Sequence, residues 1–302
     1  MKSAHLEVSG HYTVPNLGAR ILAALERAGK DLRKLTPDDL APVDEFHIRG
    51  RAATEELAQW VRIRPDHALL DVGCGLGGTS RYLAGSTGCS VVGVDLTEEY
   101  CRVAEMLSAR VGLADRTVFR QGSALALPFE DDRFDIVWTE HVQMNIADKA
   151  GFYGELRRVL KPGGQLAFHD ILAGSGGASG SGTEDGDRDG GGIHLPVPWA
   201  TEASINHLIR VGELRALLSR CGFEVVRWED KTKVSISFLR SVQKRVREEG
   251  WMPVGLHLLM GDDAATRFAN VLRNLEEDRV RVVQAVMRRT AQRPPRPGRN
   301  AP

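Results

Sequence analysis

Two acidic residues and a run of glycines have the spacing of a nucleotide-binding turn. Apolar residues 68–70 lead into Asp71, glycines follow, and a helical pattern begins near Thr79. Glycine is required where the backbone takes a positive φ or lies against a ligand. The pattern therefore predicts a strand, a tight turn and a helix N-terminus, which is where nucleotides bind in doubly wound sheets. The glycines are Gly73, Gly75, Gly77 and Gly78.

The acidic residues distinguish two classes of nucleotide. The glycines also fit the dinucleotide pattern G-x-G-x-x-G, which by itself would predict NAD. A carboxylate at Asp71 would repel the pyrophosphate of a dinucleotide, whereas S-adenosylmethionine has no phosphate and carries a cationic methionine end. The next predicted strand, residues 90–95, ends in Asp95, which is placed to accept hydrogen bonds from two ribose hydroxyls. We therefore expect S-adenosylmethionine as the cofactor, with NAD as the alternative.

These motifs resemble the class I S-adenosylmethionine-dependent methyltransferases. Residues 120–138 resemble that family's Gly-Asp-Ala-x-x-Leu-Pro-Phe and Phe-Asp-x-Val stretches, and Lys161-Pro-Gly-Gly resembles its turn before the fifth strand. Ser123 stands where the family has an acid for the adenine amino group, and an uncharged hydroxyl accepts that hydrogen bond more weakly. The resemblance implies cofactor contacts from Asp71, Gly73, Gly75, Gly77, Asp95, Leu96, Ser123, Ala124 and Glu140.

Alternating strands and helices over residues 66–170 indicate an α/β fold. Strands are predicted at 68–72, 90–95, 117–121, 134–139 and 165–170, with helices at 79–85, 97–112 and 148–160. Such alternation predicts a parallel sheet covered on both faces, with every strand's carboxyl end on one rim. The resemblance implies a Rossmann-like methyltransferase sheet with an N-terminal helical lid and a C-terminal helical extension.

The predicted organisation has four parts. Residues 262–290 are expected to be a helix or helix pair, and the Gly-rich residues 173–192 a disordered insert, since they lack apolar side chains. The predicted parts are a lid (1–60), the cofactor-binding domain (61–235), the extension (236–292) and a tail (293–302).

Polar side chains after the fourth and fifth strands are candidates for the transfer chemistry. Methyl transfer is an in-line displacement, so alignment supplies much of the rate, and a base is needed only where the acceptor loses a proton. Glu140 and His141 are the predicted catalytic residues, although Glu140 also fits a solvated loop carboxylate. Phe46 and His47 form a further candidate stretch, in which His47 either contacts the cofactor or caps a turn. The predicted acceptor contacts are Gln143, His169 and Trp199.

Three functions of the protein remain open, two of which differ in the molecule that accepts the methyl group. Residues 138–149, 168–171 and 196–200 resemble sarcosine/dimethylglycine N-methyltransferases, which implies a small amine acceptor. Glu140 and the indole of Trp199 would then stabilise the cation that forms. Leu and Met residues between 252 and 260 would instead line an apolar cavity for a quinone or isoprenoid acceptor methylated on carbon. A non-catalytic protein with a relic cofactor site is the third possibility.

Composition argues against several classes of partner. Forty basic and forty acidic residues leave no net charge, which argues against a nucleic-acid partner. The four cysteines lack metal-ligand spacing, so no metal site is expected. The N-terminal residues lack an apolar signal core and no apolar run is long enough to span a bilayer. We expect a cytoplasmic protein with a small-molecule substrate, and a homo-oligomer is an open possibility.

Overall fold

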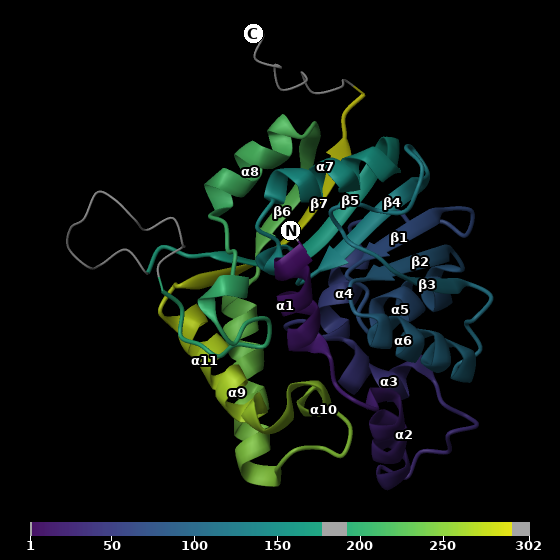
Figure 1. Ribbon diagram of the computed structural model, residues 1–302, viewed down its shortest axis with the longest axis vertical. Coiled ribbons are helices and arrows are strands. Elements are labelled where there is room, and N and C mark those ends of the chain that lie inside the picture. The colour runs from purple at the N-terminus through teal and green to yellow at the C-terminus, as the bar shows by residue number, and fades with distance from the viewer. Residues whose placement is uncertain (1, 177–191, 292–302) are drawn as a thin grey trace.

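A seven-stranded mixed sheet forms the centre of the molecule. The computed structural model describes residues 2–176 and 192–291 of the 302-residue chain. The strand order is β3-β2-β1-β4-β5-β7-β6 (Figure 1). Strands β1 to β5 pair in parallel, whereas β7 is antiparallel to both of its neighbours. The strands are β1 (Ala68–Val72), β2 (Ser90–Asp95), β3 (Thr117–Gln121), β4 (Phe134–Glu140), β5 (Leu160–Ala173), β6 (Phe223–Asp230) and β7 (Val280–Arg289).

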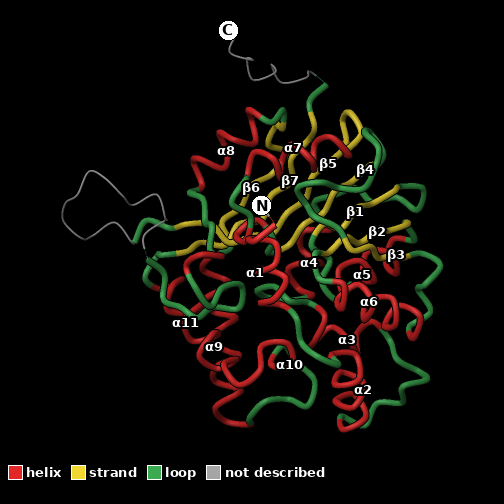
Figure 2. Tube along the Cα trace, viewed as in Figure 1, coloured by secondary structure: helices red, strands yellow, loops and turns green. Residues whose placement is uncertain are grey.

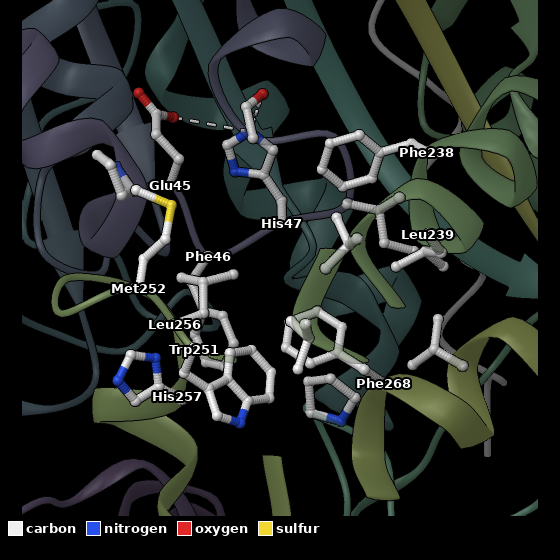
Figure 3. Close-up of a pocket in the computed structure, with 18 of the residues that line it drawn as sticks. Glu45, Phe46, His47, Phe238, Leu239, Trp251, Met252, Leu256, His257 and Phe268 are labelled. Atoms are coloured by element: carbon white, nitrogen blue, oxygen red, sulfur yellow. Dashed lines mark hydrogen bonds and ion pairs between the residues drawn. The ribbon is translucent and has the colours of Figure 1, made fainter. Parts of the chain in front are cut away.

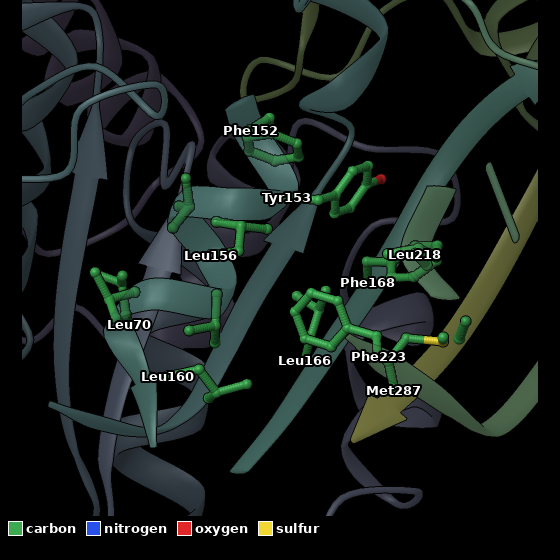
Figure 4. Packing of buried hydrophobic residues seen from close by; sticks show 14 of the residues in the cluster. Leu70, Phe152, Tyr153, Leu156, Leu160, Leu166, Phe168, Leu218, Phe223 and Met287 are labelled. Atoms are coloured by element: carbon green, nitrogen blue, oxygen red, sulfur yellow. The ribbon is translucent and has the colours of Figure 1, made fainter. Parts of the chain in front are cut away.

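Helices cover both faces of this sheet, which explains the continuous apolar runs of its central strands. On one face, α4 and α5 pack on the sheet in a cluster that contains Leu57, Leu83 and Trp138. On the other face, α7 and α8 pack in a larger cluster that contains Phe152 and Leu218 (Figure 4). The sheet helices are α4 (Arg51–Ala58), α5 (Gly78–Thr87), α6 (Glu98–Arg110), α7 (Lys149–Val159) and α8 (Val211–Arg220).

Helices from the two ends of the chain meet beyond the carboxyl ends of the parallel strands (Figures 1 and 2). One buried cluster joins α2 and α3 to α6 and α10. A second joins α9 and α11 to Trp199 and the start of β7. These elements are α1 (Lys2–Tyr12), α2 (Leu17–Arg27), α3 (Pro37–Asp44), α9 (Thr232–Glu249), α10 (His257–Met260) and α11 (Ala264–Glu276), with short 3₁₀ helices at Gln143–Asn145, Ala203–Ile205 and Gly261–Asp263.

The predicted α/β fold with helices on both faces of a Rossmann-like sheet is confirmed. The bounds of β1, β2 and β3 are those predicted from the sequence. The prediction of a helix through residue 290 was wrong, because residues 280–289 form β7, which lies between β5 and β6 in the sheet. The sheet is therefore not wholly parallel. Seven of the ten residues of β7 are buried, and a strand buried on both faces has the same continuous apolar pattern as a buried helix.

The predicted insert over residues 173–192 lies mostly outside the described residues. Its first residues are placed, since Ala173 ends β5 and the N–H groups of Gly174 and Gly176 donate to the carbonyl oxygens of Arg279 and Asp278. Residues 177–191, on which the prediction of disorder chiefly falls, are not described, and neither is the tail from residue 292 onward.

Candidate active site

The glycine turn after β1 is held against the end of β2. The N–H of Gly73 donates to the Val94 carbonyl at 2.7 Å, and the N–H of Gly75 donates to Asp95 Oδ2 at 2.9 Å. Gly73 has φ 75°, and a Cβ there would lie 2.2 Å from a methyl of Val142. Only glycine fits such a position, because both the backbone conformation and the space exclude a side chain.

A cavity of about 260 Å³ opens over this turn. Tyr12 and Val8 from α1 also line it, although sequence reasoning assigned no helix to this segment. Most of the predicted cofactor residues line the cavity, namely Gly73, Gly75, Asp95, Leu96, Ser123, Ala124 and Glu140.

Asp71 and Gly77 support the turn from behind. Neither Asp71 nor Gly77 is among the described residues that line the cavity. Asp71 is 2 % exposed and accepts a hydrogen bond from Ser80 Oγ at 2.6 Å. Burial raises the pKa of the Asp71 carboxyl to about 7, so this group is partly protonated near neutral pH. Gly77 has φ 80° at the N-terminus of α5, where a Cβ would lie 2.6 Å from the Phe119 ring.

A second cavity, of about 230 Å³, adjoins the first and is mainly apolar. The two cavities share the lining residues Phe46, His141, Pro198 and Trp199. The remaining walls of the second cavity come chiefly from α9, the 250–256 loop and α11. Figure 3 shows its aromatic and aliphatic side chains facing a common space. Those that are labelled there include Phe238, Leu239, Trp251, Met252, Leu256 and Phe268.

Buried polar groups line the second cavity beside Phe46. Glu45 and His47 lie on its wall, and Glu140 lies behind them on the wall of the first cavity. The exposed fractions of the three residues are 2 %, 8 % and 8 %. Hydroxyls of two threonines join the group: Thr79 Oγ1 donates to Glu140 at 2.6 Å, and Thr54 Oγ1 lies 3.1 Å from the same carboxylate. Sequence reasoning missed Glu45, because nothing in a linear pattern brings it to Glu140.

His141 stands at the junction of the two cavities. It has a φ of 52°, and its N–H donates to the carbonyl of His169 at 2.8 Å. Its ring stacks on that of His169 with centroids 5.0 Å apart. Burial lowers the pKa of both imidazoles well below the usual value, so both are neutral near pH 7.

Two of the predicted acceptor contacts lie behind the cavity walls. Gln143 and His169 are fully buried, and neither lines the two cavities within the described structure. Gln143 Nε2 donates to the Ile171 carbonyl at 2.7 Å, and His169 Nε2 lies 3.0 Å from the Ile48 carbonyl. Both side chains therefore support the loops of the site.

The third predicted acceptor contact, Trp199, lines both cavities. It is 2 % exposed, and its Nε1 donates to Asn206 Oδ1 at 2.9 Å. Its carbonyl accepts from Asn145 Nδ2 at 2.7 Å. These bonds fix the indole, which leaves its carbon surface as the part that can contact a ligand.

Lys149 and Asp170 anchor the loop after β4. Lys149 Nζ donates to the carbonyls of Gln143 and His207, each at 2.5 Å, and also to that of Ile146. Asp170 accepts from the N–H of Gln143 at 3.2 Å. Burial shifts both groups toward neutrality, raising the pKa of Asp170 to about 7 and lowering that of Lys149 to about 8.

The sequence between β1 and β5 matches a known family. Residues 70–168 fit a family model described as a methyltransferase domain. By this match, residues 70–168 are a methyltransferase domain. The predicted family resemblance is confirmed over these residues. Solved structures similar to this chain, from Haemonchus contortus and Streptomyces coelicolor A3(2), hold S-adenosylmethionine and S-adenosylhomocysteine respectively.

Curated relatives and solved structures extend this match. Methyltransferase GfsG of Streptomyces halstedii is 35 % identical over 134 residues, which are 44 % of this chain and 48 % of the relative. The chain thus spans about half or less of the length of the curated relatives that it matches. A putative sarcosine dimethylglycine methyltransferase from Galdieria sulphuraria has a TM-score of 0.60 at 20 % identity, covering 79 % of this chain and 83 % of the other.

A geranyl diphosphate C-methyltransferase from Streptomyces coelicolor A3(2) has a TM-score of 0.66 at 16 % identity, covering 95 % of this chain and 98 % of the other. Both structural likenesses have low identity and therefore show the fold alone. Within residues 2–176 and 192–291, no helix has the length and apolar composition needed to cross a bilayer.

Proposed function

We propose that this protein transfers the methyl group of S-adenosylmethionine to an apolar small molecule. The observation that carries the proposal is the pair of adjoining cavities. One lies over the glycine turn and Asp95, the other is walled by apolar side chains, and the two share His141 and Trp199. A donor in the first and an acceptor in the second would meet end to end, as in-line displacement requires.

The second cavity suits an apolar acceptor better than the small amine that the sequence favoured. Its lining is dominated by aromatic and aliphatic side chains, with Phe238, Trp251 and Phe268 on three separate elements. The charged side chains on that lining are Glu45, which already pairs with Arg51, and Arg245. A zwitterionic amino acid such as sarcosine would therefore lose much of its hydration there, at a cost of several kcal/mol. The similar solved structures include enzymes named for an amine and for an isoprenoid, so the fold does not distinguish the two acceptors.

The residues at the junction are assigned roles by position. Phe46 and Trp199 would hold the reacting part of the acceptor against the methyl group, and their ring faces would stabilise positive charge arriving with it. His141 is neutral and is placed to hydrogen-bond the acceptor. Glu140 would act through its buried partners, because its carboxylate is held by Thr79 and Thr54. Gln143 and His169 would position these groups from behind.

Two measurements test the proposal in sequence. Calorimetry with S-adenosylhomocysteine, NAD and NADH should detect binding of S-adenosylhomocysteine alone. Radiolabelled methyl transfer is then measured on a panel of apolar alcohols, phenols and prenylated compounds beside sarcosine and dimethylglycine. Turnover of amines alone would show that the apolar acceptor is wrong. Reproducible S-adenosylhomocysteine binding without turnover of any acceptor would favour the relic site.

A further inference from the structure

We propose that His47 is the general base of this site, and that the acceptor carries a hydroxyl group whose proton His47 removes. The inference rests on the proposed function and names the class of acceptor for the same site. Nothing in the family match assigns a role to His47, which lies outside residues 70–168. Two observations carry it: where the two ring nitrogens lie, and what surrounds each.

The Nε2 atom of His47 is surrounded by oxygen atoms. It lies 3.0 Å from the carbonyl oxygen of Gly50 and 3.2 Å from Thr54 Oγ1. Carboxylate oxygens of Glu45 and Glu140 lie 3.7 Å away on either side. A carbonyl oxygen has no proton to donate, so Nε2 must carry the hydrogen of this contact. In the neutral ring, the lone pair is therefore on Nδ1.

Nδ1 is the nitrogen available to a ligand. His47 lines the apolar cavity, and the described structure gives Nδ1 no hydrogen-bond partner. Figure 3 shows the contacts of the ring with Glu45 at one edge and the second nitrogen outside those contacts. The Gly50 carbonyl at Nε2 orients the ring and leaves the lone pair of Nδ1 free, with the carboxylates of Glu45 and Glu140 3.7 Å from Nε2. A histidine base is likewise held in one tautomer by an acceptor at its other nitrogen.

Two carboxylates flank the His47 ring on the side of Nε2. Glu45 Oε1 accepts from Arg51 Nε at 2.5 Å, so its other oxygen is directed toward His47 within a fixed ion pair. His141 and His169 differ from His47 in their surroundings, because neither ring forms an ion pair with a carboxylate in the described structure. Burial lowers the pKa of both of those rings well below the usual value, which makes them weak bases. The titratable and charged groups that face His47 are Glu45, Arg51, Glu140, His141 and His169.

The same geometry argues against a metal ion at this cluster. Ligand atoms of Glu45, His47 and Glu140 lie within 4.8 Å of one another, a spacing that a cation can bridge. A metal ligand must be deprotonated, so a cation at Nε2 would have to displace the proton that this atom donates to the Gly50 carbonyl. The cluster is therefore assigned to proton transfer.

Atoms and electrons balance in the proposed step. A lone pair of the acceptor hydroxyl oxygen forms the new bond to the methyl carbon. The carbon–sulfur bond breaks, and its electrons remain on sulfur, giving S-adenosylhomocysteine. The hydroxyl proton moves to Nδ1 of His47, and the electrons of the O–H bond stay on oxygen. The imidazolium lies between Glu45 and Glu140 and releases its proton to water after the methyl ether leaves.

The tautomer is tested without any acceptor. Long-range ¹H–¹⁵N NMR of the ¹⁵N-histidine-labelled full chain, saturated with S-adenosylhomocysteine, distinguishes a protonated Nε2 from a protonated Nδ1. The His47 signals are identified as those that disappear in the His47→Gln variant. They should remain in His67→Gln, the control variant, which carries the same change at a site away from both cavities. We expect hydrogen on Nε2 and a bare Nδ1 at high pH. A neutral His47 with its hydrogen on Nδ1 overturns the proposal.

The proton transfer is tested with 4-nitrophenol, whose neutral and ionised forms absorb at different wavelengths. In the complex with S-adenosylhomocysteine, we expect the wild-type protein and His67→Gln to bind it as the phenolate below the pH at which the free phenol ionises. His47→Gln should lose the phenolate band. A bound phenol that stays neutral, no binding of the phenol, or a phenolate band that survives in His47→Gln would contradict the proposal. Calorimetry on the same samples measures the binding of S-adenosylhomocysteine. Binding without a phenolate band would contradict the role of His47, whereas a lack of binding would contradict the proposed function.

Once an acceptor is known, kinetics separate a base from a structural residue. Loss of a general base lowers kcat by roughly 10²–10⁴-fold while KM changes little. His47→Gln should also lose the acidic limb of the pH–kcat profile. A variant with raised KM and an unchanged pH profile would assign His47 a structural role.

Discussion

Replacement of Asp95 should show how far one carboxylate organises the cofactor site. Its two oxygens are both used within the protein: Oδ2 accepts from Gly75 N–H at 2.9 Å and Oδ1 accepts from Thr97 N–H at 2.8 Å. The side chain also lines the cofactor cavity. Asp95→Ala would remove the proposed acceptor of two ribose hydroxyls and would release the glycine turn from the end of β2.

The size of the effect follows from these bonds. A hydrogen bond to a charged group contributes about 1.5–3 kcal/mol, and a donor left unpaired in a closed site costs about 1–3 kcal/mol. Leaving both ribose hydroxyls unpaired in the complex predicts at least about 2 kcal/mol, which is roughly a 30-fold weaker Kd for S-adenosylhomocysteine. Asp95→Asn should fall between the wild type and Asp95→Ala, because an amide keeps one acceptor oxygen for the two N–H groups.

Calorimetric titration with S-adenosylhomocysteine measures this change, and thermal unfolding without ligand shows whether the variants remain folded. Asp66→Ala is the matched control, since its side chain is 71 % exposed and pairs with Arg64 away from the cavities. An Asp95→Ala protein that is folded and binds S-adenosylhomocysteine within threefold of the wild type would refute the assignment of Asp95 to the ribose.

Three further predictions test other parts of the molecule. Gly73→Ala should abolish S-adenosylhomocysteine binding in calorimetry, because its Cβ would lie 2.2 Å from a Val142 methyl at a φ of 75°; unchanged affinity would show that the turn does not touch the cofactor. Phe238→Ala should raise KM for an apolar acceptor by roughly 5–30-fold, about 1–2 kcal/mol of lost apolar contact, with cofactor affinity unchanged, since Phe238 lines the acceptor cavity alone; equal losses for both ligands would contradict this. Asp71, with a pKa raised from 3.8 to about 7, makes the folded state bind more protons than the unfolded state in that range, so its contribution to the free energy of unfolding falls as pH rises. Asp71→Asn should therefore flatten the fall of denaturant-derived stability between about pH 4 and pH 7, and an unchanged slope would refute the shift.

Local patterns were enough to predict most of the polar residues and glycines that line the first cavity. The turn after β1 needs glycine for steric reasons, and the acids at strand ends follow runs of apolar residues, so both leave a signal in the sequence. Parallel strands bring their carboxyl ends to one rim, and this rule alone places Asp95, Ser123 and Glu140 around one cavity, where the structure has them.

The acceptor half depends on tertiary contacts that no local pattern records. Phe238, Trp251 and Phe268 lie on separate elements and look like ordinary core residues when taken one at a time. Glu45 meets Glu140 through shared threonine hydroxyls, yet the two are far apart in sequence. β7 was misassigned for a related reason, because burial on both faces removes the alternation that marks a strand.

The central claim is that a methyl group passes from S-adenosylmethionine to an apolar acceptor across the junction of the two cavities. Its most direct test is transfer of the radiolabelled methyl group to matched acceptors, an apolar alcohol or phenol beside sarcosine and dimethylglycine, by the wild-type protein and Phe238→Ala. We predict label in the apolar hydroxyl compound, lower kcat/KM for that compound in Phe238→Ala, and no label in the amines. Label that enters only sarcosine or dimethylglycine, with no effect of Phe238→Ala, would contradict the claim.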